Sequence, residues 1–258
     1  METEALTGKL VVEKVRGKST VTRSFSRYPL KFFIPNKVGS SETDAVWIYT
    51  LTYGGGIVSV RVGSGALLAV IPDPVTCFST ARYSQKQFFR VVSDSNLVIV
   101  DWITSGRHQN GEKWDFQLYK STNNIFADGD QPLFLDTVLL EQGGITNIAE
   151  RMQDYQVIAM VILLGPKLKH IQNQVQENVK RMMSEQLYAP SIGLSNHGKT
   201  HSNHPLAKPN FIASCSAFGP KGIGVVVRIA AMTTESVYRF LQHQLAGMEP
   251  LLGVSPYC

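Results

Sequence analysis

The chain has 258 residues, of which 43% are hydrophobic and 17% charged, so it can bury a core and is not intrinsically disordered. Its net charge is only +5 and the 25 basic residues are scattered, which gives no concentrated nucleic-acid-binding segment. Three widely spaced cysteines exclude a disulfide framework, and the longest apolar run, residues 157–164, is too short to span a bilayer. We therefore expect a single cytoplasmic domain, residues 1–258, without a membrane segment or a nucleic-acid partner.

The N-terminal part alternates short β-branched and aromatic runs with glycine and proline, which predicts a series of strands. The predicted strands are residues 8–15, 17–25, 28–35, 46–53, 57–62, 66–71 and 88–92. Only three residues separate 57–62 from 66–71, and this spacing predicts a hairpin. Pro72 and Pro74 then end the second of these strands.

A triple glycine follows the fourth predicted strand. Gly54, Gly55 and Gly56 permit positive φ angles or a close approach of two backbones. Their spacing, without a following helix, does not match a phosphate-binding loop. We expect a structural role for them.

The segment 97–119 combines an apolar run, a polar turn and an alternating strand. The run 97–100 fits a strand buried on both faces and ends at Asp101, whereas apolar and polar residues alternate from Trp114 onward. We interpret the segment as a hairpin with a long loop. That loop holds Asp101, Ser105, Gly106, Arg107, His108, Asn110, Gly111, Glu112 and Lys113. So many polar groups beside a packed pair of strands make the loop the first candidate for a functional site.

The C-terminal half adds strands and the only long helices. Further strands are predicted at 132–140, 155–164, 211–218 and 223–231. From Lys167 the period becomes helical, with an apolar stripe of Leu168, Ile171, Val175, Val179 and Met182 that is expected to pack on a sheet. A flexible loop is expected at about 189–210, and a closing helix starts near Thr233, a good N-cap. The fold class is mainly β, with elongated helical or sandwich-like sheet layers and two α-helices in the C-terminal third.

Catalytic interpretations of these residues are weak. Asp101 and Glu112 could serve as the acid and base of a glycoside hydrolase, but two carboxylates in one loop are commonplace. Neither Ser105 nor Cys77 lies in a motif that activates a nucleophile. The simplest alternative is structural: Arg107 pairs with Asp101 or Glu112 to hold the loop in place.

Two other kinds of site remain open from the residues. His197, His201 and His204 lie in the stretch HGKTHSNH, where neutral imidazoles suit nickel, zinc or copper, although a polar loop is a poor preformed cage. Alternatively, the chain is a β-rich oligosaccharide or single-stranded nucleic-acid binding module, with Trp102, Trp114 and Tyr119 stacking on sugars or bases.

Five motifs in order resemble one protein family. They are YGGGIVS at 53–59, GALLAVIPDPVTCF at 65–78, DWITSGR at 101–107, GEKWDF at 111–116 and VVVRIAA at 225–231. Together they resemble the urease accessory protein D family, also called UreH, and its plant-type members most closely. The resemblance implies a non-enzymatic scaffold that binds apo-urease on one side and accessory protein F on the other, where F recruits the GTPase accessory protein G.

The resemblance also implies roles for individual residues. Nickel would pass through the scaffold as a transient ion, with no tightly bound cofactor, and the scaffold could oligomerise within its complex. Candidate residues for a polar nickel path are Asp101, Ser105, Arg107 and Glu112, and the motif residues with structural roles are Gly54, Gly55, Gly56, Pro72, Pro74, Gly106, Trp114 and Arg228. Weak oxygen and nitrogen ligands suit passage better than a thiolate cage does. The C-terminal helices become candidates for the contact with protein F.

One departure from the family pattern follows Ser59. In the family, the glycine motif is followed by Gly-Asp and several further strands, whereas here the chain runs from Ser59 through Val60 and Arg61 directly to Gly63. A block of two or more strands is therefore missing. We expect the neighbouring strands to show unpaired edges, and this form to be less stable and weak in urease activation.

Overall fold

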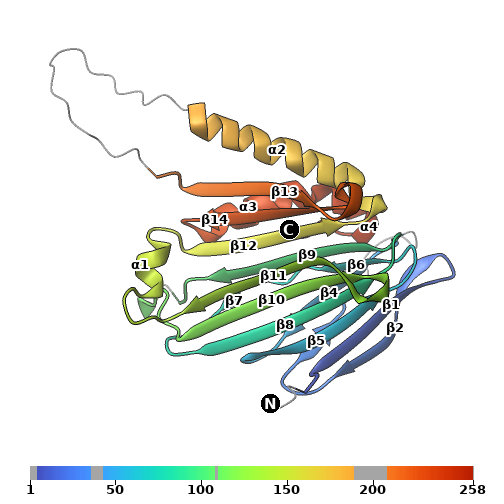
Figure 1. Cartoon of the computed structure of the whole chain (residues 1–258), viewed down its shortest axis with the longest axis horizontal. Coiled ribbons are helices and arrows are strands. Elements are labelled where there is room, and N and C mark those ends of the chain that lie inside the picture. The colour runs from blue at the N-terminus through green and yellow to red at the C-terminus, as the bar shows by residue number, and fades with distance from the viewer. Residues whose placement is uncertain (1–4, 36–42, 108–109, 189–207, 258) are drawn as a thin grey trace.

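Two β-sheets that face one another form the body of the protein (Figure 1). The computed structural model describes residues 5–35, 43–107, 110–188 and 208–257. Within these ranges the mainly β fold with sandwich-like layers and C-terminal helices is confirmed.

The first sheet has six strands in the order β11-β10-β8-β5-β1-β2. Their bounds are β1 Gly8–Val15, β2 Lys18–Ser26, β5 Gly55–Val62, β8 Arg82–Val91, β10 Leu118–Ala127 and β11 Gln131–Glu141. The outer pairs β1–β2 and β10–β11 are antiparallel, whereas β5 lies parallel to both β1 and β8, and β8 lies parallel to β10. The inner strands are therefore joined by connections that leave the sheet.

The second sheet has the order β13-β14-β12-β9-β6-β4-β3, and β7 also pairs with β9 (Figure 1). Its strands are β3 Lys31–Phe33, β4 Val46–Leu51, β6 Leu67–Val70, β7 Val75–Thr76, β9 Asn96–Thr104, β12 Val157–Leu164, β13 Phe211–Phe218 and β14 Gly224–Ala231. Every residue of β9 is buried, because one face of the strand meets the first sheet and the other meets the helices. This confirms the prediction of a strand buried on both faces.

The two long helices cover the outer face of the second sheet. The helices are α1 Ile148–Met152, α2 Lys169–Tyr188, α3 Thr234–Leu245 and α4 Glu249–Leu252, with 3-10 turns η2 Asp128–Asp130, η3 Pro166–Leu168, η4 Pro220–Gly222 and η5 Ala246–Met248. The predicted stripe of α2 packs on the sheet, and the Oγ1 of Thr233 accepts the N–H of Ser236 at 3.2 Å as the N-cap of α3. None of the described helices is long and apolar enough to cross a membrane.

Both predicted hairpins of the N-terminal half are wrong. β5 and β6 belong to different sheets, although only Gly63, Ser64, Gly65 and Ala66 separate them. β9 and β10 also lie in facing sheets, and β9 continues to Thr104, so Asp101 lies inside the strand rather than at its end. Loop length alone cannot distinguish a hairpin from a crossover between two packed sheets.

Asp101 therefore occupies a buried position inside a strand. The side-chain hydroxyl and amide groups that face it make a carboxylate tolerable there, because they hydrogen-bond to it.

The break after Ser59 leaves no unpaired strand at β5. This strand pairs with β1 along Val58–Val62 and with β8 along its whole length. The expectation of an open edge is therefore wrong for this strand in the described structure.

Candidate functional site

The ladder beside Asp101 is interrupted on one side of β9. Strand β6 pairs with β9 at Asn96–Ile99, and β7 pairs with it again only at Ile103 and Thr104. The intervening residues 71–74 contain Pro72 and Pro74, and proline cannot donate to a ladder. The second sheet therefore has a gap next to Asp101.

Asp101 accepts three hydrogen bonds from the facing strand β10. The Ser121 Oγ donates to Oδ2 at 2.5 Å, the Asn123 Nδ2 donates to Oδ2 at 2.6 Å, and the Tyr119 hydroxyl donates to Oδ1 at 3.3 Å. The Gln87 Nε2 of β8 donates to the Asn123 Oδ1 at 2.9 Å. All the donors to this buried carboxylate are neutral, so its charge has no hydrogen-bonded counter-ion among the described residues.

Burial raises the pKa of Asp101 above its ordinary value. The three hydrogen bonds act in the opposite direction, and the negative charge of Asp136 raises the pKa further. Burial also raises the pKa of Tyr119 well above its usual range, so this hydroxyl remains a donor. A cation that reaches Asp101 would therefore stabilise the ionised form of its carboxyl group.

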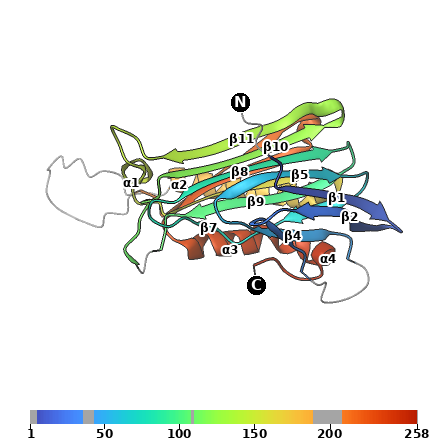
Figure 2. The ribbon, with the colours of Figure 1, turned by 90° about the horizontal axis from the view of Figure 1, so that it is seen from below.

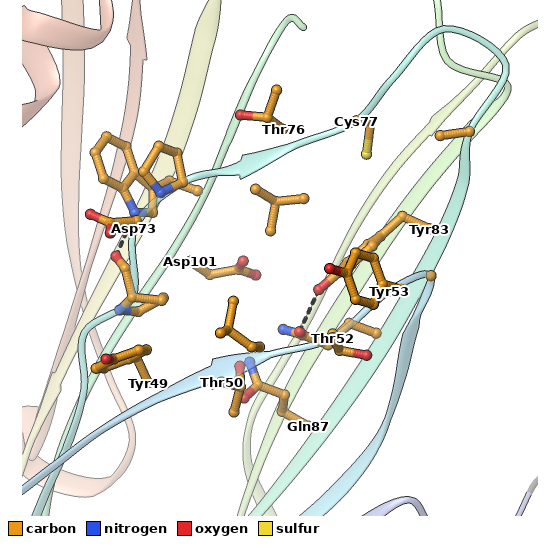
Figure 3. A pocket seen from close by; sticks show the side chains of 18 of the residues that line it. Tyr49, Thr50, Thr52, Tyr53, Asp73, Thr76, Cys77, Tyr83, Gln87 and Asp101 are labelled. Carbon is orange, nitrogen blue, oxygen red and sulfur yellow. Dashed lines mark hydrogen bonds between the residues drawn. The ribbon is translucent and has the colours of Figure 1, made fainter. Parts of the chain in front are cut away.

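A cavity of about 390 Å³ opens on the gap side of Asp101. Its polar lining includes Asp101, Gln85 and Gln87, with Tyr49, Thr50, Thr52, Asp73 and Thr76 around it. Figure 3 shows Asp101 among these side chains. Tyr53 and Phe78 line the same cavity and are exposed, so the cavity reaches the surface beside these side chains.

A second cavity of about 200 Å³ lies on the other side of β9. It is lined by Asp101, Tyr119, Asp136 and Arg228, together with apolar residues of β12 and β14. The half-exposed Arg228 donates from its guanidinium to the mostly buried Asp136 at 2.7 Å and so joins β14 to β11. Asp101 and its neighbour Trp102 line both cavities, and Asp101 is the ionisable residue that the two linings share.

Three of the predicted path residues lie elsewhere. Neither of these two cavities is lined by Ser105, Arg107 or Glu112. Arg107 instead forms an ion pair with Glu112, and its guanidinium carbon lies 4.4 Å from the centre of the Phe78 ring. The hydrogen bond from Arg107 lowers the pKa of Glu112. The structural alternative, an arginine that holds the loop in place, is therefore confirmed with Glu112 as its partner.

The glycine and tryptophan of this loop have structural roles. Gly106 has φ +136°, and a Cβ there would lie 3.1 Å from the Cβ of Glu112. Trp114 is buried and donates from Nε1 to the carbonyl of Tyr155 at 3.0 Å.

The three aromatic residues predicted to stack on sugars or bases, Trp102, Trp114 and Tyr119, are all buried. The prediction that their rings bind sugars or bases is therefore wrong.

The described residues contain no group of three His, Cys, Asp or Glu side chains that could hold a metal ion. Cys77 lines the first cavity, but burial raises the pKa of its thiol to about 11, so it stays protonated and is a poor ligand. The predicted His197, His201 and His204 lie outside the described residues. The described part of the structure therefore contains two cavities lined by isolated polar groups and no metal cage.

Sequence reasoning identified Asp101 but missed the residues around it. The inward positions of β8 and β10 are occupied by Gln87, Ser121 and Asn123. The detectable signal was the alternation of these strands, in which polar residues fall on the face that also carries Tyr83 and Tyr119. Asp136 was missed for the same reason.

Comparison with known proteins assigns the family. The family model described as UreD urease accessory protein matches residues 58–258. The chain is 58% identical to urease accessory protein D of Arabidopsis thaliana, covering 97% of this chain and 99% of that protein. It is 52% identical to the protein of the same name from Oryza sativa subsp. indica, covering 98% and 95%. It is also 28% identical to urease accessory protein UreD of Sorangium cellulosum, covering 98% and 84%.

The alignment with the Arabidopsis thaliana protein has 291 positions, more than the 258 residues of this chain. That relative therefore contains residues without a counterpart in this chain. The position of the missing block after Ser59 stays a prediction. The chain belongs to the urease accessory protein D family, whose members act in urease maturation and are not catalytic enzymes.

Proposed function

We propose that this protein is a urease-maturation scaffold that passes Ni²⁺ between its two sheets to apo-urease. The observation that supports this most is the position of Asp101, whose carboxylate lines both the cavity of about 390 Å³ and that of about 200 Å³. A divalent cation moving from one cavity to the other would meet this carboxylate on its way.

The chemistry of the lining suits transfer rather than storage. Around Asp101 the first cavity presents hydroxyl groups and side-chain amides, which hold nickel less firmly than thiolates or imidazoles do. Each cavity is lined by one further carboxylate besides Asp101, Asp73 in the first and Asp136 in the second, and the Asp136 carboxylate is paired with Arg228. An ion that passes Asp101 therefore meets scattered carboxylates rather than a cage of charged ligands. Nickel is the cargo of this passage, and no resident cofactor is proposed.

Family membership supports partners that also act in urease maturation. We propose that apo-urease and accessory protein F bind different faces, that F recruits the GTPase G, and that α2 and α3 provide the contact for F. These helices are packed against the second sheet through their apolar faces and leave their polar faces exposed. The assembly is proposed to act in the cytoplasm.

The test replaces Asp101 with Asn and compares the nickel content of urease matured in cells that lack their own scaffold. We expect Asp101→Asn to lower the nickel content severalfold while apo-urease and protein F still co-purify. Glu112→Gln is the matched control, because it removes a nearby carboxylate that lines neither cavity. Equal nickel content for Asp101→Asn and wild type would contradict the proposed path, and loss of the complex would indicate a structural role.

A further inference from the structure

The three central strands of the first sheet carry basic residues and no acidic ones. Strands β5, β8 and β10 contain five cations: Arg61, Arg82, Lys86, Arg90 and Lys120. No Asp or Glu occurs in any of the three strands. We call these five residues the basic face.

The alternation of the strands directs all five cations outward. On β8, Tyr83, Gln87 and Phe89 are buried against the second sheet, so the residues between them point to the opposite side. On β5 and β10 the buried residues likewise alternate with Arg61 and Lys120. The face is not covered by α2 and α3, which pack on the other sheet (Figure 2).

The basic face contains an unfavourable pair. Arg61 and Arg90 are register partners on neighbouring parallel strands, and like charges placed directly opposite each other destabilise a sheet. Arg90 forms an ion pair in which its Nε lies 2.8 Å from the Asp130 Oδ1, whereas Arg61 forms no ion pair with a described residue. Folding alone gains nothing from this arrangement, whereas an anionic partner does.

The side chains between the cations indicate a protein partner rather than a nucleic acid. Ser59, Ser84 and Asn124 lie between the cations and can hydrogen-bond to carboxylates. Non-specific nucleic-acid binding uses exposed aromatic rings for stacking. The outward aromatic residues of these strands, Phe88 and Phe126, are partly buried and are less exposed than Tyr53, so they offer little ring surface for stacking.

The basic face is continuous with the mouth of the first cavity. Arg82 belongs to the face and also lines the cavity of about 390 Å³. A partner bound along β5, β8 and β10 therefore reaches the opening that leads to Asp101. The long helices, which we propose as the contact for protein F, lie on the other sheet.

We infer that the basic face is the docking surface for an acidic surface of apo-urease, an inference that rests on the proposed scaffold function. Docking there places the partner at the mouth of the first cavity, where it can receive the ion. The interface is polar, and its strength depends on salt because it relies on exposed charges.

The test reverses two charges that line neither of the two cavities. The variant Arg61→Glu with Lys120→Glu is compared with Lys180→Glu plus Arg181→Glu, which makes the same charge change on the exposed side of α2. Tagged proteins are assayed for retention of apo-urease and of protein F from about 0.1 to about 1 M NaCl, over which the Debye length falls from about 10 Å to about 3 Å. Unfolding temperatures verify folding, and Arg61→Glu should not lower them because it removes the repulsion with Arg90.

We expect the sheet variant to weaken apo-urease binding at least about tenfold and to retain protein F, whereas the helix variant retains apo-urease. Wild-type binding to apo-urease should weaken as salt rises. Undiminished apo-urease binding by a folded sheet variant would overturn the docking surface and leave the nickel path intact. Failure of the wild type to bind apo-urease would overturn both proposals, and equally tight binding of a single-stranded oligonucleotide at about 0.15 M salt would overturn the choice of a protein partner.

Discussion

A single carboxylate, Asp101, sits where most β-sandwiches place an apolar side chain. It is tolerated because Ser121, Asn123 and Tyr119 donate to it, but its charge remains costly, and burial raises its pKa. A group whose pKa is raised on folding gives full stability below its unfolded pKa and loses it as pH rises through the folded value.

Asp101→Asn should therefore flatten the pH dependence of stability. The amide oxygen can accept from Ser121 and Asn123, and its NH₂ can donate to the Tyr119 hydroxyl, so the geometry is preserved. We expect equal free energies of unfolding near pH 4, and a more stable variant at pH 7 and above. Urea denaturation across this pH range is the measurement. A variant that is less stable than wild type at every pH would show that the carboxylate is structural.

The pKa of Asp44 is shifted in the opposite direction to that of Asp101. Burial would raise its pKa, but hydrogen bonds from Lys14, Lys167 and Ser19 outweigh this and lower the pKa to about 2. Its contribution to stability is present above about pH 4 and is lost as pH falls toward 2. We expect Asp44→Asn to cost about 2 kcal/mol at pH 7. Denaturation curves of the variant and wild type should converge near pH 2, and parallel curves would contradict the assignment.

At this scale the sequence indicated Asp101 and the Arg107–Glu112 pair, because both stand out against an apolar background. The sequence did not reveal that Asp101 lines the two cavities and Glu112 lines neither, because their positions depend on the sheet to which each strand belongs. The partners Ser121 and Asn123 come from a strand more than a dozen residues later, and only the register of the folded sheets brings them to Asp101.

Among the elements, strand β5 depends on a close contact at its first residue. Gly55 has φ +97°, and a Cβ there would lie 1.9 Å from the carbonyl oxygen of Ser84 on β8. Gly54 has φ +78° but its nearest neighbour would be 3.9 Å away. The expected role of these glycines, positive φ and close backbone approach, is confirmed.

The pair Gly55→Ala and Gly54→Ala separates these two causes. Gly54→Ala should cost about 1 to 2 kcal/mol, the price of a left-handed backbone. Gly55→Ala must also separate β5 from β8 and should cost about 3 kcal/mol or more. Guanidinium denaturation of the two variants is the measurement. Similar losses for both would show that the contact with Ser84 relaxes without cost.

Most strands and both long helices could be predicted, because alternation, the apolar stripe of α2 and the cap at Thr233 are local signals. Strand pairing could not. The Gly63–Gly65 connection looks like a hairpin turn by its length, yet it carries the chain from one sheet to the other. The gap beside Asp101 was equally hidden, since Pro72 and Pro74 marked an end of a strand without showing which neighbour they would leave unpaired.

At the scale of the whole molecule, the missing block of strands bears on both the stability of the protein and its activation of urease. The described sheets close around β5 without an open edge, yet relatives contain residues that this chain lacks. We still expect the full-length form to unfold at a higher temperature and to activate urease more strongly. Thermal unfolding and urease activity in cells without an endogenous scaffold are the measurements. Equal values for both forms would show that the block is dispensable.

On the proposed path, Ni²⁺ contacts the ionised carboxylate of Asp101 as it moves from one cavity to the other. The most direct test is the rate of nickel transfer to apo-urease by the assembled complex as a function of pH, for wild type and Asp101→Asn. Because burial raises the pKa of Asp101, the wild-type rate should rise with pH as the carboxyl group loses its proton, and the variant should be slow at every pH. Superimposable pH profiles and equal rates would contradict the account.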